Sequence, residues 1–353
     1  MDLEESLLSV VSNFPIEGTV RSIEKYGEGH INLTYLVVTD KKKYILQKIN
    51  NIVFKDVDML MGNMYKVTEH LKSRGVETLN IILTNNGETY LTDGDYRLTD
   101  YIEDTVVYQK NENGEIFKNV GEAFAIFQKH LADFDANDIV DTIPDFHNTP
   151  KRFADFKQAV DNDVCKRARL VESEIQFVLD RHKDFSIVTD AIASGEIPLR
   201  VTHNDTKLNN VLMDKKTGKC RAVIDLDTVM QGSLLYDFGD SIRFGASTAR
   251  EDEKDLDKVH FDINLFKSFA EGFCKPLKNI FTKKEIELLP FSAYLMTMEC
   301  GMRFLGDYLN GDTYFNINYP EHNLDRCRTQ FKLAKEIWEK LSEMKSIVSN
   351  LLI

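Results

Sequence analysis

Short apolar runs separated by turn residues fill the first hundred positions of the chain. They are rich in Val, Ile, Leu, Tyr and Thr, which is typical of β-strands. The predicted strands cover residues 18–26, 31–39, 43–49, 88–92 and 96–102. Turn residues separate the first three runs, at 27–29 and 40–42, and a helix is predicted over 57–72. The pattern predicts five strands with one helix between the third and the fourth.

Apolar residues recur at helical spacing through most of the remaining chain, as in Val120, Phe124, Phe127 and Leu131. Predicted helices cover 117–131, 150–162, 170–194, 262–273, 283–309 and 323–350. Three short apolar strands are predicted at 199–201, 211–213 and 222–224. The expected fold class is α+β, with a strand-rich N-terminal lobe (1–103) and a mostly helical C-terminal lobe (104–353).

Composition and charge narrow the function classes. The chain has 353 residues, more than one core usually supports, so two lobes are expected. A net charge of −13 argues against general nucleic-acid binding, which needs a basic face. Five scattered cysteines without a CxxC pair, an acidic start, and no apolar run of about 18 residues favour a reduced, cytoplasmic protein. We expect a monomer that binds no membrane.

The segment from 203 to 210 carries the strongest chemical signal. His203, Asp205 and Asn210 form an H-x-D-x₄-N pattern, and Asp225 follows the apolar strand at 222–224. Such a pattern arises by accident on the order of 0.04 times in a chain of this length. Phosphoryl transfer needs a residue that orients the acceptor proton and oxygen ligands for Mg²⁺, and this segment offers both.

Longer strings around this pattern resemble the aminoglycoside-phosphotransferase and choline-kinase superfamily, which is built on the protein-kinase fold. The similar strings are 26–32, 197–210, 224–247 and 296–308. Within the superfamily they are most similar to the bacterial N-acetylhexosamine 1-kinases. The resemblance covers nearly the whole chain and implies a two-lobed, protein-kinase-like fold, ATP and Mg²⁺ as nucleotide and metal, and a sugar acceptor.

The resemblance carries roles over by position. It implies that Asp205 accepts or orients the acceptor proton and that Asn210 and Asp225 bind Mg²⁺. Asp227 would lie on the same side as Asp225, because side chains alternate along a strand. It could hold a second metal or a metal-bound water, or it could be an acidic turn residue. Lys207 could touch the γ-phosphate, as the loop lysine of protein kinases does, or lie on the surface.

Asp237-Phe238-Gly239 spells the metal motif of protein kinases. It follows a loop that leads into a helix, whereas the metal-binding Asp should follow a strand, as Asp225 does. In the wider family an Asp at this position braces the backbone of the catalytic loop. We therefore interpret Asp237 as structural.

The glycine turn of the N-terminal lobe is a candidate phosphate cradle. Gly27, Gly29 and Asn32 lie between two predicted strands, where glycine lets the backbone approach a ligand closely. The same spacing is also common in ordinary hairpin loops. His30 could bind the sugar or a phosphate, or it could be an exposed loop residue.

The third strand departs from the family pattern. Related kinases place a Lys or Arg there to hold the α- and β-phosphates, but Gln47 occupies this position and Lys48 follows it. The two side chains face opposite ways, so either Lys48 acts in a shifted register or Gln47 acts more weakly. Glu69 is only a possible partner for such a cation. The hinge that contacts adenine is predicted at Tyr101, Ile102 and Glu103.

The acceptor pocket is expected in the helical lobe. Glu299, Arg303 and Asp307 fall on one stripe of the predicted helix 283–309, either as a solvated ion-pair row or as a functional face. The resemblance favours Arg303 as a donor to sugar hydroxyls or to an acetamide carbonyl. Tyr314 and Phe244 could flank the sugar ring or belong to the core.

Three functions compete. The leading hypothesis is ATP-dependent phosphorylation of the anomeric (C1) hydroxyl of N-acetylglucosamine or N-acetylgalactosamine. The second keeps the kinase chemistry but takes an aminoglycoside, choline or methylthioribose as the acceptor. The third is a pseudokinase that binds nucleotide without turnover, for which the missing cation at Gln47 is the only support.

Overall fold

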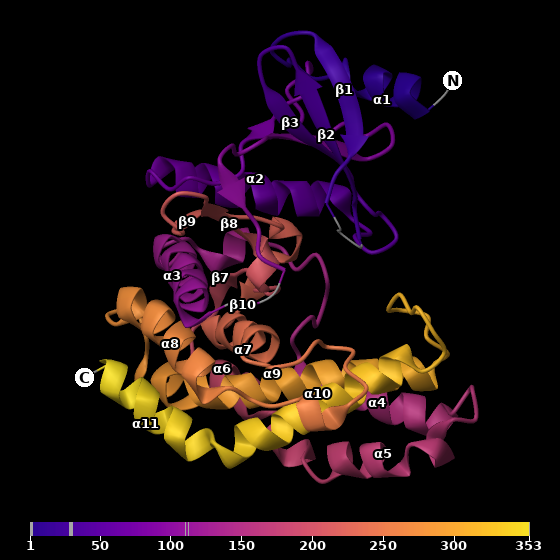
Figure 1. The fold of residues 1–353 in the computed structure, drawn as a ribbon, viewed down its shortest axis with the longest axis vertical. Helices are drawn as coiled ribbons and strands as arrows, with labels where there is room; N and C mark the ends of the chain where they lie inside the picture. Colours follow the sequence, from indigo (N-terminus) through magenta and orange to yellow (C-terminus); the bar gives the residue numbers. More distant parts are fainter. Residues whose placement is uncertain (1–2, 28–30, 110, 112, 353) are drawn as a thin grey trace.

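The computed structural model describes residues 3–27, 31–109, 111 and 113–352. A strand-rich lobe lies at the top of Figure 1 and a helical lobe beneath it, with the termini at opposite ends. The predicted α+β, two-lobed architecture is confirmed. No helix within these residues is long and apolar enough to cross a membrane.

The upper lobe is an antiparallel sheet in the order β1-β2-β3-β5-β4. Its strands are β1 (Val20–Lys25), β2 (Leu33–Thr39), β3 (Lys43–Lys48), β4 (Ile81–Ile82) and β5 (Tyr96–Asp100). The predicted strand at 88–92 is wrong, because β4 lies at 81–82 and buries Ile81 against the core. Within 88–92, Leu91 forms only an isolated bridge to Tyr96.

Alternation along the strands gives the sheet two different faces. Leu46 and Leu98 lie on one face, in a small core with Leu7 and Val11 of helix α1 (Leu3–Val11). Helix α2 (Val57–Ser73), which starts at the N-cap Asp56, instead packs into the large core of the helical lobe. The buried apolar residues of β2, β3 and β5 therefore lie in a different hydrophobic cluster from α2, whereas Ile81 of β4 joins the cluster of α2.

The chain passes between the lobes at residues 101–104. After β5, strand β6 (Thr105–Val106) pairs with β8 (Val211–Asp214) of the lower lobe. Lys43 forms an ion pair with Glu103 at 3.2 Å, and the hydroxyl of Thr105 donates to the carbonyl of Ile102. A short connector therefore lies where the sequence predicts the hinge. The domain boundary after residue 103 stays a prediction.

Helices form most of the lower lobe. They are α3 (Gly114–His130), α4 (Thr149–Asn162), α5 (Glu172–Leu179), α6 (Ile187–Ala193), α7 (Leu234–Gly245), α8 (Ile263–Leu277), α9 (Lys283–Leu309), α10 (His322–Glu339) and α11 (Leu341–Leu352). Strands β7 (Arg200–Thr202), β9 (Cys220–Val223) and β10 (Met230–Gly232) complete it. α9 begins and ends where predicted, with a capping box of Thr282 and Glu285.

Two predicted helices are each broken in two. The segment predicted at 170–194 turns between α5 and α6, where Asp184 accepts a hydrogen bond from Tyr294 and Phe185 is buried. The segment at 323–350 ends its first helix before Lys340, whose ammonium donates to the carbonyl of Phe261. In both cases a tertiary contact at the break outweighs continuous helical periodicity.

Helices α3 and α8 cross at two glycines, which allow their backbones to touch. A Cβ on Gly272 would overlap the carbonyl oxygen of Lys118, and a Cβ on Gly121 would overlap that of Phe269. Both obstacles are backbone atoms, so neither can move aside alone.

We therefore expect Gly272→Ala to destabilise the protein by about 1–3 kcal/mol, the usual cost of overpacking. The matched control is Gly62→Ala in α2, where an added Cβ meets no atom within 4 Å. That change should stabilise by about 0.5–1 kcal/mol, because alanine is the better helix former. Urea unfolding of both variants measures the difference. Equal effects would contradict the close crossing.

Candidate active site

The loop that follows β7 is built around a buried histidine. Nε2 of His203 donates to the carbonyl of Ile224 at 2.9 Å, and Nδ1 accepts from the N–H of Asp205 at 3.3 Å. One ring nitrogen therefore donates and the other accepts. The edges of Phe124 and Phe127 pack on it. His203 therefore ties the loop of Asp205 to the strand that leads to Asp225.

Asp237 braces the same loop from α7. Its carboxylate is fully buried and accepts the backbone N–H groups of His203 at 3.1 Å and Asn204 at 2.8 Å. The side chain of Gln128 donates to it as well. Burial raises the pKa of Asp237, and these donors act in the opposite direction. These hydrogen bonds are those of a brace, and a purely structural role for Asp237 stays a prediction.

Asp205, Lys207 and Asn210 meet at the surface of the loop. Lys207 Nζ lies 3.0 Å from Asp205 Oδ1, and this neighbour raises the pKa of the lysine. Nδ2 of Asn210 donates to the Asp205 carbonyl at 2.8 Å. The amide nitrogen of Asn210 is thereby used, and its Oδ1 is left as an acceptor.

Asp225 supplies a carboxylate beside this group. It begins the turn 226–228 with φ +60°, in the left-handed region that Asp enters more readily than most residues do. Its side chain is exposed to solvent. The protein atoms crowded around it still remove part of its water, which raises its pKa to about 6, and the nearby charges of Asp227 and Asp205 add to the effect. A cation bound at this carboxylate would favour its charged form and would therefore oppose the three effects that raise its pKa.

These donors fit Mg²⁺. The metal usually takes one or two carboxylates and completes its shell with water and phosphate oxygens, so Asp225 and Asn210 suffice on the protein side. Across the described ranges, no three His, Cys, Asp or Glu side chains gather into a metal cluster of their own.

Asp227 lies in a buried network with the sheet. Arg97 of β5, only 1% exposed, donates to its two carboxylate oxygens, with Nη2 at 3.0 Å from Oδ2. Asn32 Nδ2 donates to the same carboxylate at 2.5 Å, and Asn32 Oδ1 accepts the N–H of Asn50. Arg97 Nε donates to Gln47 Oε1 at 2.9 Å.

The structure places Gln47 and Lys48, the two candidates on β3 for holding the α- and β-phosphates, on opposite faces of the sheet. Gln47 lies in the buried network, whereas Lys48 is exposed on the other face, with its ammonium 5.6 Å from the ring centroid of Tyr96. Glu69 pairs with Lys72 at 2.8 Å on the surface of α2. Gly27 is exposed with φ +75°, and the predicted Gly29 and His30 lie outside the described residues.

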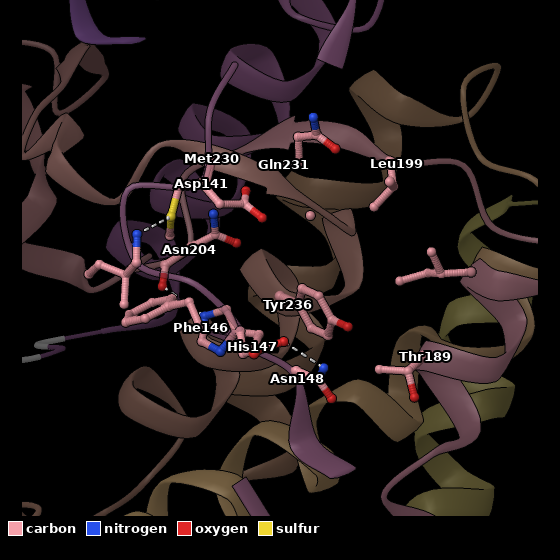
Figure 2. Close-up of a pocket in the computed structure, with 14 residues that line it drawn as sticks. Asp141, Phe146, His147, Asn148, Thr189, Leu199, Asn204, Met230, Gln231 and Tyr236 are labelled. Carbon is pink, nitrogen blue, oxygen red and sulfur yellow. Dashed lines mark hydrogen bonds between the residues drawn. The ribbon is translucent and has the colours of Figure 1, made fainter. Parts of the chain in front are cut away.

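A second buried pair connects α9 to the catalytic loop. Glu299 Oε1 lies 2.8 Å from His147 Nδ1, and His147 Nε2 lies 3.0 Å from the Asn204 carbonyl. Figure 2 shows His147 with Tyr236 beside it, below Asn204. Both ring nitrogens of His147 therefore face acceptor oxygens. Burial alone would raise the pKa of Glu299, but hydrogen bonds from His147 and Thr149 lower it.

Arg303 and Tyr314 line one cavity of about 190 Å³, which opens between α4, α9 and the segment at 313–315. Arg303 Nη2 lies 3.4 Å from the Tyr314 hydroxyl. Arg152 of α4 lines the same cavity; burial and the charge of Arg303 lower its pKa. Two guanidinium groups therefore converge on this space.

The remaining acceptor candidates are placed differently. Asp307 lines the cavity, but its carboxylate accepts the N–H groups of residues 313–315 and the amide of Asn323, so it shapes the loop that carries Tyr314. Phe244 is half-buried against the core and is not among the residues around this cavity. The stripe of Glu299, Arg303 and Asp307 points inward and is no solvated row.

Sequence reasoning missed Arg97, His147 and Arg152. The sequence does carry a signal for Arg97, because it is a charged residue within the apolar run Tyr96-Arg97-Leu98. That run forms β5, which is the neighbour of β3 in the sheet. His147 and Arg152 carry no such local signal. Their positions depend on how the loop before α4 folds under the catalytic loop.

The family model described as "APH: Phosphotransferase enzyme family" matches residues 22–266. The match covers well over half of the chain and includes the catalytic loop, Asp225 and Asp237. The chain belongs to this phosphotransferase family.

Solved structures share the fold across the whole chain. An aminoglycoside phosphotransferase from Alicyclobacillus acidocaldarius aligns with a TM-score of 0.60 and 14% identity, over 97% of this chain and 96% of its own. A choline kinase from Cryptosporidium parvum aligns at 0.60 and 14%, over 99% of both chains. A spectinomycin phosphotransferase, solved with ADP and spectinomycin, aligns at 0.58 and 13%, over 97% and 99%.

Proposed function

We propose that the protein transfers the γ-phosphoryl group of ATP to the anomeric hydroxyl of an N-acetylhexosamine, giving ADP and the N-acetylhexosamine 1-phosphate. Membership of the phosphotransferase family supports the reaction class. The cavity of Arg152 and Arg303 is the observation that carries the choice of acceptor, together with the resemblance of strings 197–210 and 296–308.

The charge of this cavity argues for an uncharged acceptor. A choline or aminoglycoside site wants carboxylates or an aromatic cage around the cation. Two guanidinium groups repel a cation, and of the two carboxylates nearby, Asp155 pairs with Lys151 and Asp307 is used by backbone N–H groups. Planar guanidinium donors suit hydroxyl and carbonyl oxygens, as an N-acetylated sugar offers. Tyr314, exposed at 62%, provides a ring for the sugar face.

In the proposed reaction, Asp205 accepts the proton of the C1 hydroxyl as the sugar oxygen forms its bond to the γ-phosphorus and the bond from that phosphorus to the β–γ bridging oxygen breaks. Lys207, next to Asp205, faces the developing phosphate charge. His203 and the buried Asp237 hold the backbone of the loop that carries Asp205. Positioning of this kind contributes much of the rate in phosphoryl transfer.

Asn210 and Asp225 are the residues that would hold Mg²⁺ in this proposal. When bound, the metal neutralises charge on the phosphates. The hinge residues Tyr101, Ile102 and Glu103 and the turn that contains Gly27 stay the proposed nucleotide contacts, with adenine read by the backbone.

The direct test is an ADP-release assay on N-acetylglucosamine, N-acetylgalactosamine, glucose, choline and kanamycin, with phosphorus NMR of the product. We expect turnover on an N-acetylhexosamine and a phosphorus signal coupled to the anomeric proton. Preference for choline or kanamycin would overturn the proposed acceptor and leave the kinase chemistry standing. ATP binding by calorimetry without ADP production on any acceptor would favour a pseudokinase instead.

A further inference from the structure

One face of the sheet carries Gln47 and Arg97 and is turned toward α2; we call it the cleft face. Among the described residues this face shows no lysine–glutamate pair of the kind that related kinases use. The sequence predicts the cation of such a pair at the position of Gln47 on β3. On the facing helix, Met61 and Met64 of α2 approach this point, and Glu69 pairs with Lys72 on the surface. A cation held between β3 and α2 therefore has no carboxylate partner on α2.

Arg97 places a guanidinium at the same point from the neighbouring strand. Gln47 and Arg97 are direct cross-strand partners of β3 and β5, so their side chains share the cleft face. Gln47 accepts from Arg97 Nε, which aims the Nη atoms past Met64, whose sulfur lies 3.4 Å from Nη1. The missing cation of β3 is thus replaced by one from β5.

The carboxylate partner of Arg97 comes from the other lobe. Asp227, 3% exposed, lies two residues after Asp225 and accepts both Nη groups of Arg97 as a fork. Asn32 of the loop before β2 holds the same carboxylate. The buried apolar residues of β2, β3 and β5 belong to the small core, and those of the lower lobe belong to the large core, which Ile81 of β4 also joins. The polar network of Arg97 therefore adds a link between the sheet and the lower lobe.

We propose that Arg97 and Asp227 form an inter-lobe latch that replaces the lysine–glutamate pair and sets the position of Asp225 against the sheet. Arg97 is a positioning residue that acts through Asp227, and Gln47 orients it. In this assignment Asp227 anchors the latch and is not a metal ligand. The inference rests on the proposed function only in that the cleft binds a Mg²⁺-nucleotide.

The geometry predicts what the latch tolerates. A lysine keeps the charge of Arg97 but cannot make two parallel hydrogen bonds to one carboxylate while also reaching Gln47. Removing the guanidinium altogether leaves Asp227 as an unpaired buried charge, which destabilises a protein strongly whatever its function. The test must therefore separate the positioning of Asp225 by the Arg97–Asp227 pair from the effect of that pair on the stability of the fold.

The test measures ADP binding by calorimetry, with and without Mg²⁺, and kcat and KM on the preferred sugar. Arg97→Lys should weaken ADP binding in the presence of Mg²⁺ by about tenfold or more and lower kcat by about 10- to 100-fold, because small displacements of reacting groups are costly. ADP binding without Mg²⁺ and the KM for the sugar should change far less.

Two further variants make the result specific. Arg221→Met removes another arginine–carboxylate pair between the lobes, with exposed Glu77, and should leave both readouts unchanged. Arg97→Met with Asp227→Asn removes both buried charges, so it should fold and still bind Mg²⁺-ADP as weakly as Arg97→Lys. Wild-type affinity in Arg97→Lys, recovery in the double variant, or an equal loss in Arg221→Met would each overturn the latch. The ADP readout needs no sugar turnover, so failure of the proposed acceptor would not obscure it.

Discussion

Replacing Asp205 with Asn should lower kcat by about 100-fold or more, the range of a positioned general base, while the fold survives. The amide has nearly the shape of the carboxylate but cannot take the acceptor proton. The side chain is a quarter exposed and its partner Lys207 more so, so loss of this ion pair should cost little stability. Initial rates with saturating ATP and N-acetylhexosamine, and an unfolding curve in urea, measure the two effects.

The control is Asp180→Asn, an exposed position at the C-cap of α5 that carries the same change of charge. It should leave kcat unchanged. If Asp205→Asn also turned over at the wild-type rate, Asp205 would not be the base and the proposed mechanism would be wrong. A lower kcat at an unchanged midpoint of unfolding separates catalysis from stability.

Local sequence signals were sufficient to predict that Asp205, Asn210 and Asp225 lie near one another. The apolar strands at 211–213 and 222–224 fix where their connecting loops lie, so Asp205, Asn210 and Asp225 could be placed beside one another before any coordinates. Asp237 could be assigned to the brace because it follows a loop instead of a strand. Each of these inferences uses residues close in sequence to a regular element.

Long-range polar pairing set the limit of prediction. Arg97 pairs with Asp227 at a separation of 130 residues in the sequence, and Glu299 pairs with His147 at a separation of 152 residues. The sequence pattern around a carboxylate does not identify its partner. The sequence therefore predicts Asp227 as a metal or water ligand or as an acidic turn residue, and Glu299 as part of either a solvated ion-pair row or a functional face. The predictions of continuous helices at 170–194 and 323–350 are wrong for the same reason, since the contacts at Asp184 and Lys340 come from distant segments.

Asp237→Ala should cost both stability and turnover. The change leaves two backbone N–H groups and the amide of Gln128 buried without an acceptor, at about 1–3 kcal/mol for each donor. The relief of a buried carboxylate, whose pKa is raised by burial, offsets part of this. We expect a loss of about 3 kcal/mol in urea unfolding, and a fall in kcat at temperatures where the variant stays folded.

Asp237→Asn decides between a brace and a metal ligand. The amide keeps one acceptor oxygen for the loop, so stability and kcat should lie between those of the wild type and Asp237→Ala. A brace leaves the Mg²⁺ requirement alone, so the Mg²⁺ concentration for half-maximal rate should match the wild type. The same change at Asp225 should raise that concentration, because Asp225 is the carboxylate proposed to hold the metal. If the Mg²⁺ requirement shifted at Asp237 and not at Asp225, the protein-kinase reading of Asp237-Phe238-Gly239 would be right after all.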